Sequence, residues 1–298
     1  MSTDSRNRDP MSLPGGASVR IREMRITDIP AGLALCRASG WNQTGRDWQH
    51  FLIAAPRGAL VAEQDGRVVG TVATLPYGPF TWISMVLVDP VVRGRGIGMA
   101  LLHRGLALVP GDVVARLDAT PAGEVLYRRL GFTREIALAR WFADHTAPPA
   151  PLVPGVRPLE AADWPGVREM DLRAFGASRA RLLARLAREA PEYAWIADGQ
   201  GGMLRGFVFG RHGHVRDHVG PLVAESAGIA QALLAACRQS HPDRPLFIDA
   251  PDDQREWSNA LSASGFAIER PFLRMYRGQL TSPGQRALVF AIAGPEFG

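Results

Sequence analysis

A glycine-rich basic turn is the segment of this sequence whose residue types and spacing point most clearly to chemistry. It follows an apolar run that ends at Val88-Asp89-Pro90, and it reads Arg93-Gly94-Arg95-Gly96-Ile97-Gly98-Met99. Glycines at alternate positions let a backbone approach an anion without Cβ clashes, and a following helix start supplies N–H donors and the positive end of its dipole. The turn is therefore predicted to bind a diphosphate.

Three phosphate-binding motifs contain such glycines, and the details separate them. A Walker A loop requires a lysine, and all 34 basic residues of this chain are arginine. A dinucleotide fingerprint requires glycine or alanine three residues past its second glycine, where this chain has Met99 or Leu101. The pattern that remains is Arg-x-x-Gly-x-Gly, formed by Arg93, Gly96 and Gly98.

This pattern, after a strand that ends Val-x-Pro, resembles motif A of the GCN5-related N-acetyltransferases (GNAT superfamily). The resemblance implies acetyl-CoA as cofactor, with its diphosphate held by residues 93–99. It also implies that backbone groups of the preceding strand align the pantetheine arm and polarise the thioester carbonyl. The cofactor-binding residues expected on this basis are Val86, Leu87, Val88, Arg93, Gly94, Arg95, Gly96, Ile97, Gly98 and Met99.

A second element lies at the distance that this family requires. A buried strand is predicted at Val113–Leu117, a helix start at Thr120 or Pro121, and a left-handed helix end at Gly131. In the resemblance, Tyr127 takes the place of the tyrosine that protonates the departing thiolate. A phenol, with a pKa of about 10 against about 8.5 for a thiol, holds its proton at neutral pH. The alternative is a tyrosine that only packs.

The general base is not assigned by the family pattern. Residues 83–87 read Ile-Ser-Met-Val-Leu, without the glutamate that many of these enzymes place there. Asp118, at the end of the neighbouring strand, is the candidate base, although aspartate also commonly caps the turn into a helix. The terminal carboxylate of Gly298 is a further possibility.

Two groups of residues are candidates for binding the acceptor. Trp41, Asn42 and Trp48 lie between two predicted helices that border the acceptor amine in the resembled fold, where tryptophan suits a cation or an aromatic group. Asp171 and Arg179 are expected about two turns apart on a long helical segment, Ala161–Ala190. The alternatives are core packing for the tryptophans and a surface or interdomain ion pair for Asp171 and Arg179.

The chain looks like two degenerate copies of one unit. Four prolines in Ala147–Pro154 predict a stiff linker. Leu117-Asp118-Ala119 and Gly131-Phe132 recur as Ile248-Asp249-Ala250 and Gly265-Phe266, at a nearly constant offset. We therefore predict four parts, which are a disordered tail (1–18), a catalytic domain (19–145), a proline-rich linker (146–155) and a degenerate copy with a C-terminal tail (156–298).

The elements that must position these residues follow from periodicity and turn signals. Asp65-Gly66 predicts a tight hairpin. Strands with helices on both faces imply an α+β fold, a tandem of two mixed-sheet layered domains. The expected strands are Val19–Glu23, Ala59–Gln64, Arg67–Leu75, Thr81–Val88, Val113–Leu117 and Glu135–Trp141, and the expected helices begin near Ile29, Gly45, Gly96 and Pro121.

The second copy keeps the frame without the chemistry. Residues 219–229 lack the arginine and paired glycines, and Leu261 stands where the tyrosine would be. One active site per chain is therefore predicted. The tandem arrangement, Gly40–Thr44, Asp171 with Arg179, and the tail 291–298 are similar to the YitH-like branch of the family, over residues 19–298.

Composition limits the other functions. A net charge of +5 with scattered arginines argues against a nucleic-acid partner, and no apolar run reaches the ~20 residues that cross a membrane. A cytoplasmic protein, monomeric or homodimeric, is expected. The two cysteines favour buried thiols. His212, His214 and His218 would share one face of an extended 211–219, but no metal site is predicted from them.

These observations favour an acetyl-CoA-dependent N-acetyltransferase acting on the primary amine of a small molecule. Two alternatives come from other classes. One is a non-catalytic sensor of acyl-CoA or a small molecule, which the intact loop and Tyr127 disfavour. The other is a nucleotide-binding reductase, which tight binding of a nicotinamide cofactor would identify.

Overall fold

The computed structural model describes residues 11–12, 18–144, 153–240, 244–281 and 284–298. Contacts divide the chain into two compact units, each with its own internal packing. Unit 1 is drawn from residues 1–76 and 81–115, and unit 2 from residues 77–80 and 116–298. Most of the predicted tail (1–18) and of the predicted linker (146–155) lies outside the described residues, but Met11–Ser12 forms a short strand, β1.

Unit 1 contains an antiparallel sheet in the order β1-β2-β3-β4-β5. The tight hairpin predicted at Asp65-Gly66 is confirmed, since both residues have a positive φ, 51° and 75°. The predicted strands of this sheet are confirmed to within a residue at each end. Their bounds are β2 Ser18–Glu23, β3 Ala59–Gln64, β4 Arg67–Pro76 and β5 Phe80–Val88.

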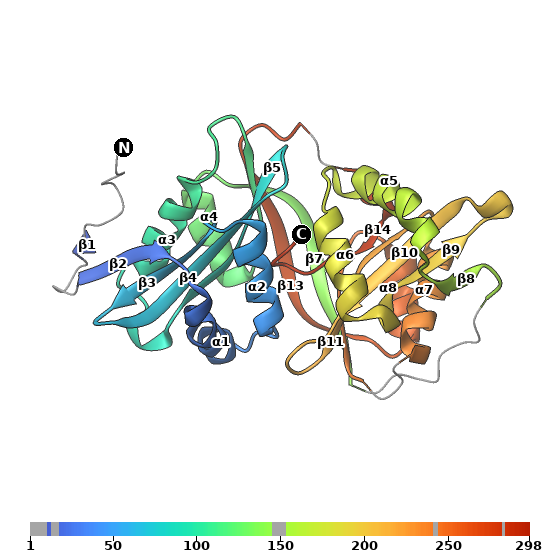
Figure 1. Ribbon diagram of the computed structural model, residues 1–298, viewed down its shortest axis with the longest axis horizontal. Coiled ribbons are helices and arrows are strands. Elements are labelled where there is room, and N and C mark those ends of the chain that lie inside the picture. Colours follow the sequence, from blue (N-terminus) through green and yellow to red (C-terminus); the bar gives the residue numbers. More distant parts are fainter. Residues whose placement is uncertain (1–10, 13–17, 145–152, 241–243, 282–283) are drawn as a thin grey trace. The chain divides into compact units, whose positions relative to one another are not determined.

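Three helices cover this sheet, α1 and α2 on one face and α3 on the other (Figure 1). They are α1 Ile29–Ala38, α2 Gly45–Ala54 and α3 Ile97–Leu106. The helix α3 lies close to β4 because Gly70 leaves room, where a Cβ would stand 2.8 Å from Leu101 Cδ1. This close packing fixes the start of α3 near the end of β5.

Unit 2 contains a longer mixed sheet in the order β6-β13-β7-β12-β11-β10-β9-β8, with β14 beside β11. Its first strand, β6, crosses the boundary between the units. The strand bounds are β6 Val114–Ala119, β7 Thr133–Ala143, β8 Val156–Pro158, β9 Trp195–Asp198, β10 Leu204–Arg211, β11 Asp217–Ala224, β12 Leu246–Pro251, β13 Ala267–Arg277 and β14 Val289–Ala291.

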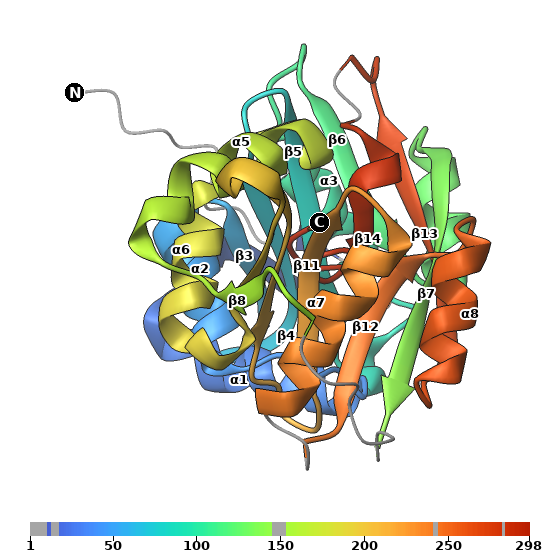
Figure 2. The same cartoon turned by 90° about the vertical axis from the view of Figure 1, so that its right-hand side faces the viewer.

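Helices lie on both faces of this sheet. Figure 2 shows α5 and α6 on one side of β10 and β11, and α7 on the other. The core of the unit lies beneath α7, where Leu233, Leu234 and Cys237 are buried against the sheet. The helix bounds are α4 Pro121–Arg129, α5 Trp164–Phe175, α6 Ala180–Glu189, α7 Ala227–Ser240 and α8 Arg255–Ala263.

The duplication extends to individual ion pairs. In unit 1, Arg22 donates two hydrogen bonds to Asp28, at 2.7 and 3.0 Å. In unit 2, Arg157 donates two to Asp163, at 2.9 and 2.8 Å. Both aspartates also accept a backbone N–H three residues earlier, at the start of a helix. Equivalent side chains therefore fix equivalent strand-to-helix turns.

The last strands of the two sequence copies pair with each other rather than each within its own copy. In unit 2, β7 lies between β12 and β13. The buried carboxylates follow the same exchange, because Asp118 on β6 pairs with Arg274 on β13, and Asp249 on β12 pairs with Arg140 on β7. The compact units are consequently divided at other residues than the sequence repeat.

One local prediction in the second copy is wrong. The expected single helix over 161–190 is broken after Phe175, because Gly176 takes a left-handed φ of 85° that ends α5. The histidines would share a face only if residues 211–219 were extended throughout, and residues 212–216 instead form the loop between β10 and β11. There His212 Nδ1 lies 3.1 Å from Asp217, whereas His218 Nε2 lies 3.0 Å from Asp249, so the histidines do not converge.

Within the described ranges, a group of three or more His, Cys, Asp or Glu side chains placed to hold a metal ion is not found. A helix with the length and apolarity to cross a membrane is also not found among these residues.

Candidate active site

The glycine-rich turn is a left-handed loop that leads directly into α3. Gly94 has a φ of 77°, and Gly96, the N-cap residue of α3, has a φ of 84°. Residues with a side chain rarely adopt a positive φ, so both positions require glycine. The local backbone therefore explains two of the three alternating glycines without reference to a ligand.

The start of α3 presents backbone donors. The first hydrogen bond of the helix runs from the Ala100 N–H to the Gly96 carbonyl, at 3.0 Å. The backbone N–H groups of residues 97–99 come before this bond, so the helix itself offers them no acceptor. A Cβ on Gly98 would stand 3.4 Å from Val88 Cγ2, so its absence keeps this side of the helix start open. Residues 93–96 are exposed. The arrangement fits the diphosphate of a coenzyme.

The side chain of Arg93 connects the loop to the preceding strand, β5, through a hydrogen bond. Its Nε donates to the Val88 carbonyl at 3.0 Å, and its Nη2 donates to Ser39 Oγ at 3.3 Å. The guanidinium thus lies beside the end of β5 and close to α1. Arg95 is exposed on the same turn.

A bulge interrupts β5 just before the loop. Thr71 pairs with Leu87 and Ala73 with Ser84, so two residues of β5, Met85 and Val86, face one residue of β4. Met85 has a positive φ of 53°, and its carbonyl accepts from Thr71 Oγ1 at 2.7 Å. The regular ladder is therefore interrupted at Met85 and Val86, whereas Leu87 and Val88 pair with Thr71 and Gly70 of β4. Residues 86–88 were predicted to align the pantetheine arm.

Tyr127 lies on α4 in unit 2, four residues before the left-handed Gly131. Its ring packs against Phe132, with centroids 5.8 Å apart. Burial raises the pKa of Tyr127 to about 12. The phenol therefore holds its proton firmly at neutral pH, as a proton donor must.

Asp118 is held in an ion pair within unit 2. Both of its carboxylate oxygens accept from Arg274, at 2.8 and 2.9 Å, and its side chain is fully buried. Burial raises the pKa of Asp118, and pairing with Asp118 raises the pKa of Arg274 in spite of burial. Arg274 occupies both oxygens of Asp118, and the role of Asp118 as general base stays a prediction.

Asp171 and Arg179 form a buried ion pair at the junction of α5 and α6. A surface ion pair, one of the alternatives to binding of the acceptor, is therefore not what the structure contains. Arg179 Nε donates to both Asp171 oxygens at 3.1 Å, and the two side chains are 1% and 2% exposed. Arg179 Nη1 also donates to the main-chain oxygen of Gly298, at 2.6 Å. The junction and the C-terminal tail are thus fixed by one guanidinium.

The residues proposed to border an amine lie at the start of α2 in unit 1. Trp41 and Asn42 are half-buried, and the Trp41 carbonyl accepts from Arg37 at 2.8 Å. Trp48 is fully buried, and it packs against Phe51 and beside Gly32. Its position is that of a core residue, and binding by these three residues stays a prediction.

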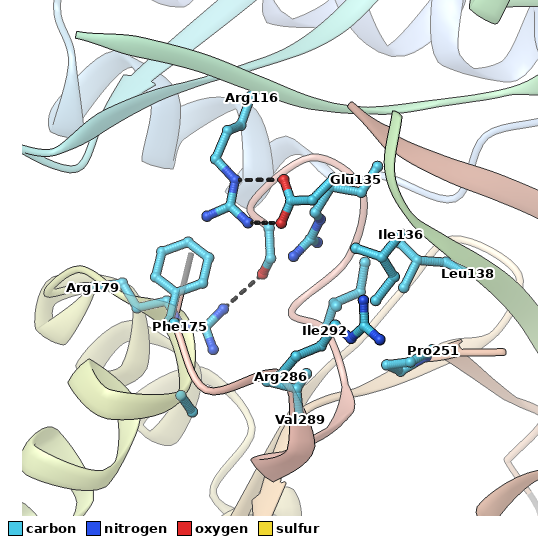
Figure 3. A pocket seen from close by; sticks show the side chains of 14 residues that line it. Arg116, Glu135, Ile136, Leu138, Phe175, Arg179, Pro251, Arg286, Val289 and Ile292 are labelled. Carbon is cyan, nitrogen blue, oxygen red and sulfur yellow. Dashed lines mark hydrogen bonds and ion pairs between the residues drawn. The ribbon is translucent and has the colours of Figure 1, made fainter. Parts of the chain in front are cut away.

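Sequence reasoning missed four charged residues that line one cavity in unit 2 together with Arg179 (Figure 3). They are Arg116, Glu135, Arg274 and Arg286. Arg116 donates to Glu135 through Nε at 3.1 Å and through Nη2. An arginine inside the otherwise apolar strand 113–117 was the signal available in the sequence. Arg274 pairs with Asp118 across 156 positions of the chain, which hid its place in the cluster.

Comparison with known families supports the reading of both copies. Models of the acetyltransferase (GNAT) domain match residues 55–134 and residues 167–291. The uncharacterised N-acetyltransferase YitH of Bacillus subtilis (strain 168) is 25% identical over 286 residues, which cover 94% of this chain and 98% of that protein.

Solved structures share the architecture. A Pyrococcus horikoshii protein described as an acetyltransferase matches with a TM-score of 0.82 at 23% identity, over 98% of this chain and 99% of that one. A tandem GNAT protein from the clavulanic acid biosynthesis pathway matches with a TM-score of 0.61 at 19% identity, over 90% and 99%. With a family domain matched in each half of its sequence, this chain belongs to the GNAT acetyltransferases and is a tandem member of that superfamily.

Proposed function

We propose that this acetyltransferase uses acetyl-CoA to acetylate the primary amine of a small molecule. The observation that carries the proposal is the left-handed loop 93–96 at the start of α3. It combines exposed glycines, backbone donors and two arginines, which suit a doubly charged diphosphate. Acetyl-CoA supplies the activated acetyl group, and the chain's own residues supply binding, alignment and a proton.

The bulge in β5 supports a role for the backbone of residues 86–88. A strand whose ladder is interrupted retains main-chain donors and acceptors that can pair with an extended, amide-containing arm. Donors aimed at a thioester carbonyl would stabilise the negative charge that develops on it. We assign alignment of the pantetheine arm to Val86, Leu87 and Val88.

Tyr127 supplies the proton for the departing thiolate. Its pKa of about 12 lies above that of a thiol, about 8.5, so the transfer from phenol to thiolate is uphill at equilibrium but available from a fully protonated group. Release of the product and re-protonation of the phenolate by solvent complete the cycle. The general base is left unassigned in this proposal.

One coenzyme site per chain follows from the second copy. There the strand β11 is paired with β14 where the first copy has its bulge, with Leu222 opposite Ala291 and Val223 opposite Val289. Main-chain groups that would align a pantetheine arm are used by the chain's own tail. Residues 219–229 also lack the arginine and the paired glycines.

Titration calorimetry of the full chain with acetyl-CoA tests the proposal. We expect one site per chain, and a loss of tenfold or more in affinity for Gly98→Val, because donors to a charged oxygen contribute about 1.5 to 3 kcal/mol each. Gly111→Val is the matched control, since a Cβ at Gly111 meets nothing within 4 Å. Two equal sites, or equal binding by both variants, would contradict the proposal.

A panel of small primary amines, scored by acetyl-CoA-dependent release of free thiol, tests the transfer itself. We expect release to depend on the amine and to disappear when the amine is replaced by the corresponding alcohol. Release that is the same with and without an amine would indicate hydrolysis rather than transfer.

A further inference from the structure

The cavity of unit 2 has a volume of about 270 Å³, and all the residues that line it belong to that unit. At ~30 Å³ for each water in the liquid, this is the space of about nine waters. The cavity therefore has the size of a small organic molecule. Its lining combines charged side chains, aliphatic side chains and the ring of Phe175 (Figure 3).

Guanidinium groups dominate the charged part of the lining. Four arginine side chains reach the cavity, against the carboxylate side chain of Glu135 and the terminal residue Gly298, whose main-chain oxygen accepts from Arg179. The aspartates that pair with Arg179 and Arg274 are not among the lining residues, so they lie behind the guanidiniums. A ligand in the cavity meets the cationic side of these ion pairs, which favours an anionic group.

These guanidiniums are held in place before any ligand arrives. Arg179 is bonded to Asp171, and its guanidinium carbon lies 4.0 Å from the centroid of the Phe175 ring. Arg116 is bonded to Glu135, and its guanidinium carbon lies 4.6 Å from the centroid of the Phe80 ring. A binding group that is already ordered loses little conformational entropy when it accepts a ligand.

Glu135 gives the cavity a second preference, for a positively charged group of the ligand. Its side chain is 13% exposed, and it is the carboxylate side chain of the lining that can accept from an ammonium. Figure 3 shows Glu135 beside Arg116, whereas Arg286 lies toward Val289 and Ile292. A molecule with both an ammonium and an acidic group can satisfy both ends.

Aliphatic side chains form much of the uncharged lining, beside the aromatic ring of Phe175. Ile136 and Leu138 of β7 and Val289 and Ile292 near the C-terminus contribute apolar side chains to the same cavity. Burial of a branched aliphatic group of about four carbons against such a surface favours binding.

We propose that this cavity binds a small amino acid-like molecule, an amine that carries a carboxylate and an aliphatic side chain. The carboxylate contacts the arginines, the ammonium contacts Glu135, and the side chain lies against the aliphatic residues. If the proposed function is correct, this molecule is the acetyl acceptor, so the substrate class rests on that proposal whereas the binding does not.

Calorimetry without acetyl-CoA tests the binding with four probes that share one carbon skeleton. They are L-leucine, L-leucinamide, 4-methylpentanoate and 4-methylpentanamide. We expect L-leucine to bind most tightly, and L-leucinamide, which lacks the carboxylate, to bind about tenfold or more weakly. Equal binding of L-leucine and L-leucinamide, or no binding of any probe at millimolar concentration, would overturn the proposal.

Two neighbouring substitutions test the location. Arg286 is exposed, so Arg286→Gln is expected to fold, and it should weaken L-leucine binding about threefold to tenfold while leaving L-leucinamide unchanged. Asp253 is the ion-pair partner of Arg286 and does not line the cavity. Asp253→Asn removes its charge, and it should leave L-leucine binding equal or tighter. Weaker binding in both variants to the same extent, or in neither, would place the carboxylate elsewhere.

The outcomes separate this inference from the proposed function. L-leucine binding without thiol release in the presence of acetyl-CoA would support the cavity and contradict its use as the acceptor site. Thiol release with simple amines but no carboxylate preference would support the enzyme and contradict the inference. Weaker acetyl-CoA binding in Arg286→Gln, or competition by inorganic phosphate with acetyl-CoA there, would assign the cavity to coenzyme phosphate instead and also contradict it.

Discussion

At the scale of single residues, Tyr127 makes the sharpest prediction. Tyr127→Phe removes one oxygen and its proton and leaves the ring that packs on Phe132. General acid catalysis typically contributes 10²- to 10⁴-fold, so turnover should fall by about that factor. Acetyl-CoA affinity, measured by calorimetry, should change by less than about twofold, because the loss concerns the proton and not ground-state binding.

The pH dependence gives an independent check of the same residue. Since burial raises the pKa of Tyr127 to about 12, the phenol stays protonated as the pH rises from 7 to 10 and loses its proton only near 12. The ratio of wild-type to Tyr127→Phe activity should therefore be constant between pH 7 and 10. A ratio under about threefold, or one that falls steeply near pH 9, would contradict the role of proton donor.

Single residues were predictable where their partners lie close in sequence. The loop glycines and Tyr127 followed from short spacings, because a turn and a helix end impose them locally. Asp118 was identified without its partner, since Arg274 is 156 positions further along the chain. The cavity residues Arg116 and Glu135 are only 19 positions apart, and they were missed because no motif links an arginine and a glutamate at that spacing.

At the scale of elements, local signals set the boundaries well in the first copy. The helix α2 begins where predicted because Thr44 and Asp47 form a capping box, with the Thr44 N–H bonded to Asp47 at 2.8 Å. The break between α5 and α6 was missed because a single Gly176 within a polar helical pattern is compatible with an unbroken helix. Only its left-handed φ reveals the end.

The junction of α5 and α6 depends on the buried Asp171–Arg179 pair. Arg179→Met leaves Asp171 as an uncompensated buried charge, which typically costs about 3 to 5 kcal/mol of unfolding free energy. The double variant Asp171→Leu/Arg179→Met removes both charges and should be clearly more stable than the single variant. Chemical denaturation followed by circular dichroism measures both.

Arg188→Met is the control for loss of an arginine, because that side chain is 71% exposed. It should unfold within about 0.5 kcal/mol of the wild type. Equal destabilisation of the single and double variants would show that packing of the guanidinium on Phe175, rather than pairing, fixes the junction.

At the scale of the whole molecule, the repeat was visible in the sequence but the exchange of final strands was not. A constant offset identifies equivalent segments, and it carries no information on which copy of a strand pairs with which neighbour. The pairing of β7 with both β12 and β13 depends on hydrogen bonds between segments more than 100 residues apart, such as Arg140 and Asp249, which are separated by 109 positions.

This exchange predicts that the two sequence copies depend on each other for folding. Residues 156–298 alone lack β7, so β12 and β13 each lose a neighbour and Asp249, which is fully buried, loses Arg140. Burial opposes ionisation of Asp249, and Arg140 and His218 outweigh it, so that its pKa lies well below its ordinary value. Without Arg140 the buried carboxylate is strongly destabilising.

We therefore expect residues 1–145 and 156–298, expressed as separate chains, to be aggregated or to unfold without cooperativity. Expressed together, they should form a soluble 1:1 complex with one cooperative thermal transition, because the exchanged strands supply each other's hydrogen bonds and ion pairs. Size-exclusion chromatography with light scattering and calorimetry measure both properties. A soluble, monomeric 156–298 fragment with protected amides and a sharp transition would show that β12 and β13 fold without β7, and the copies would then be independent domains.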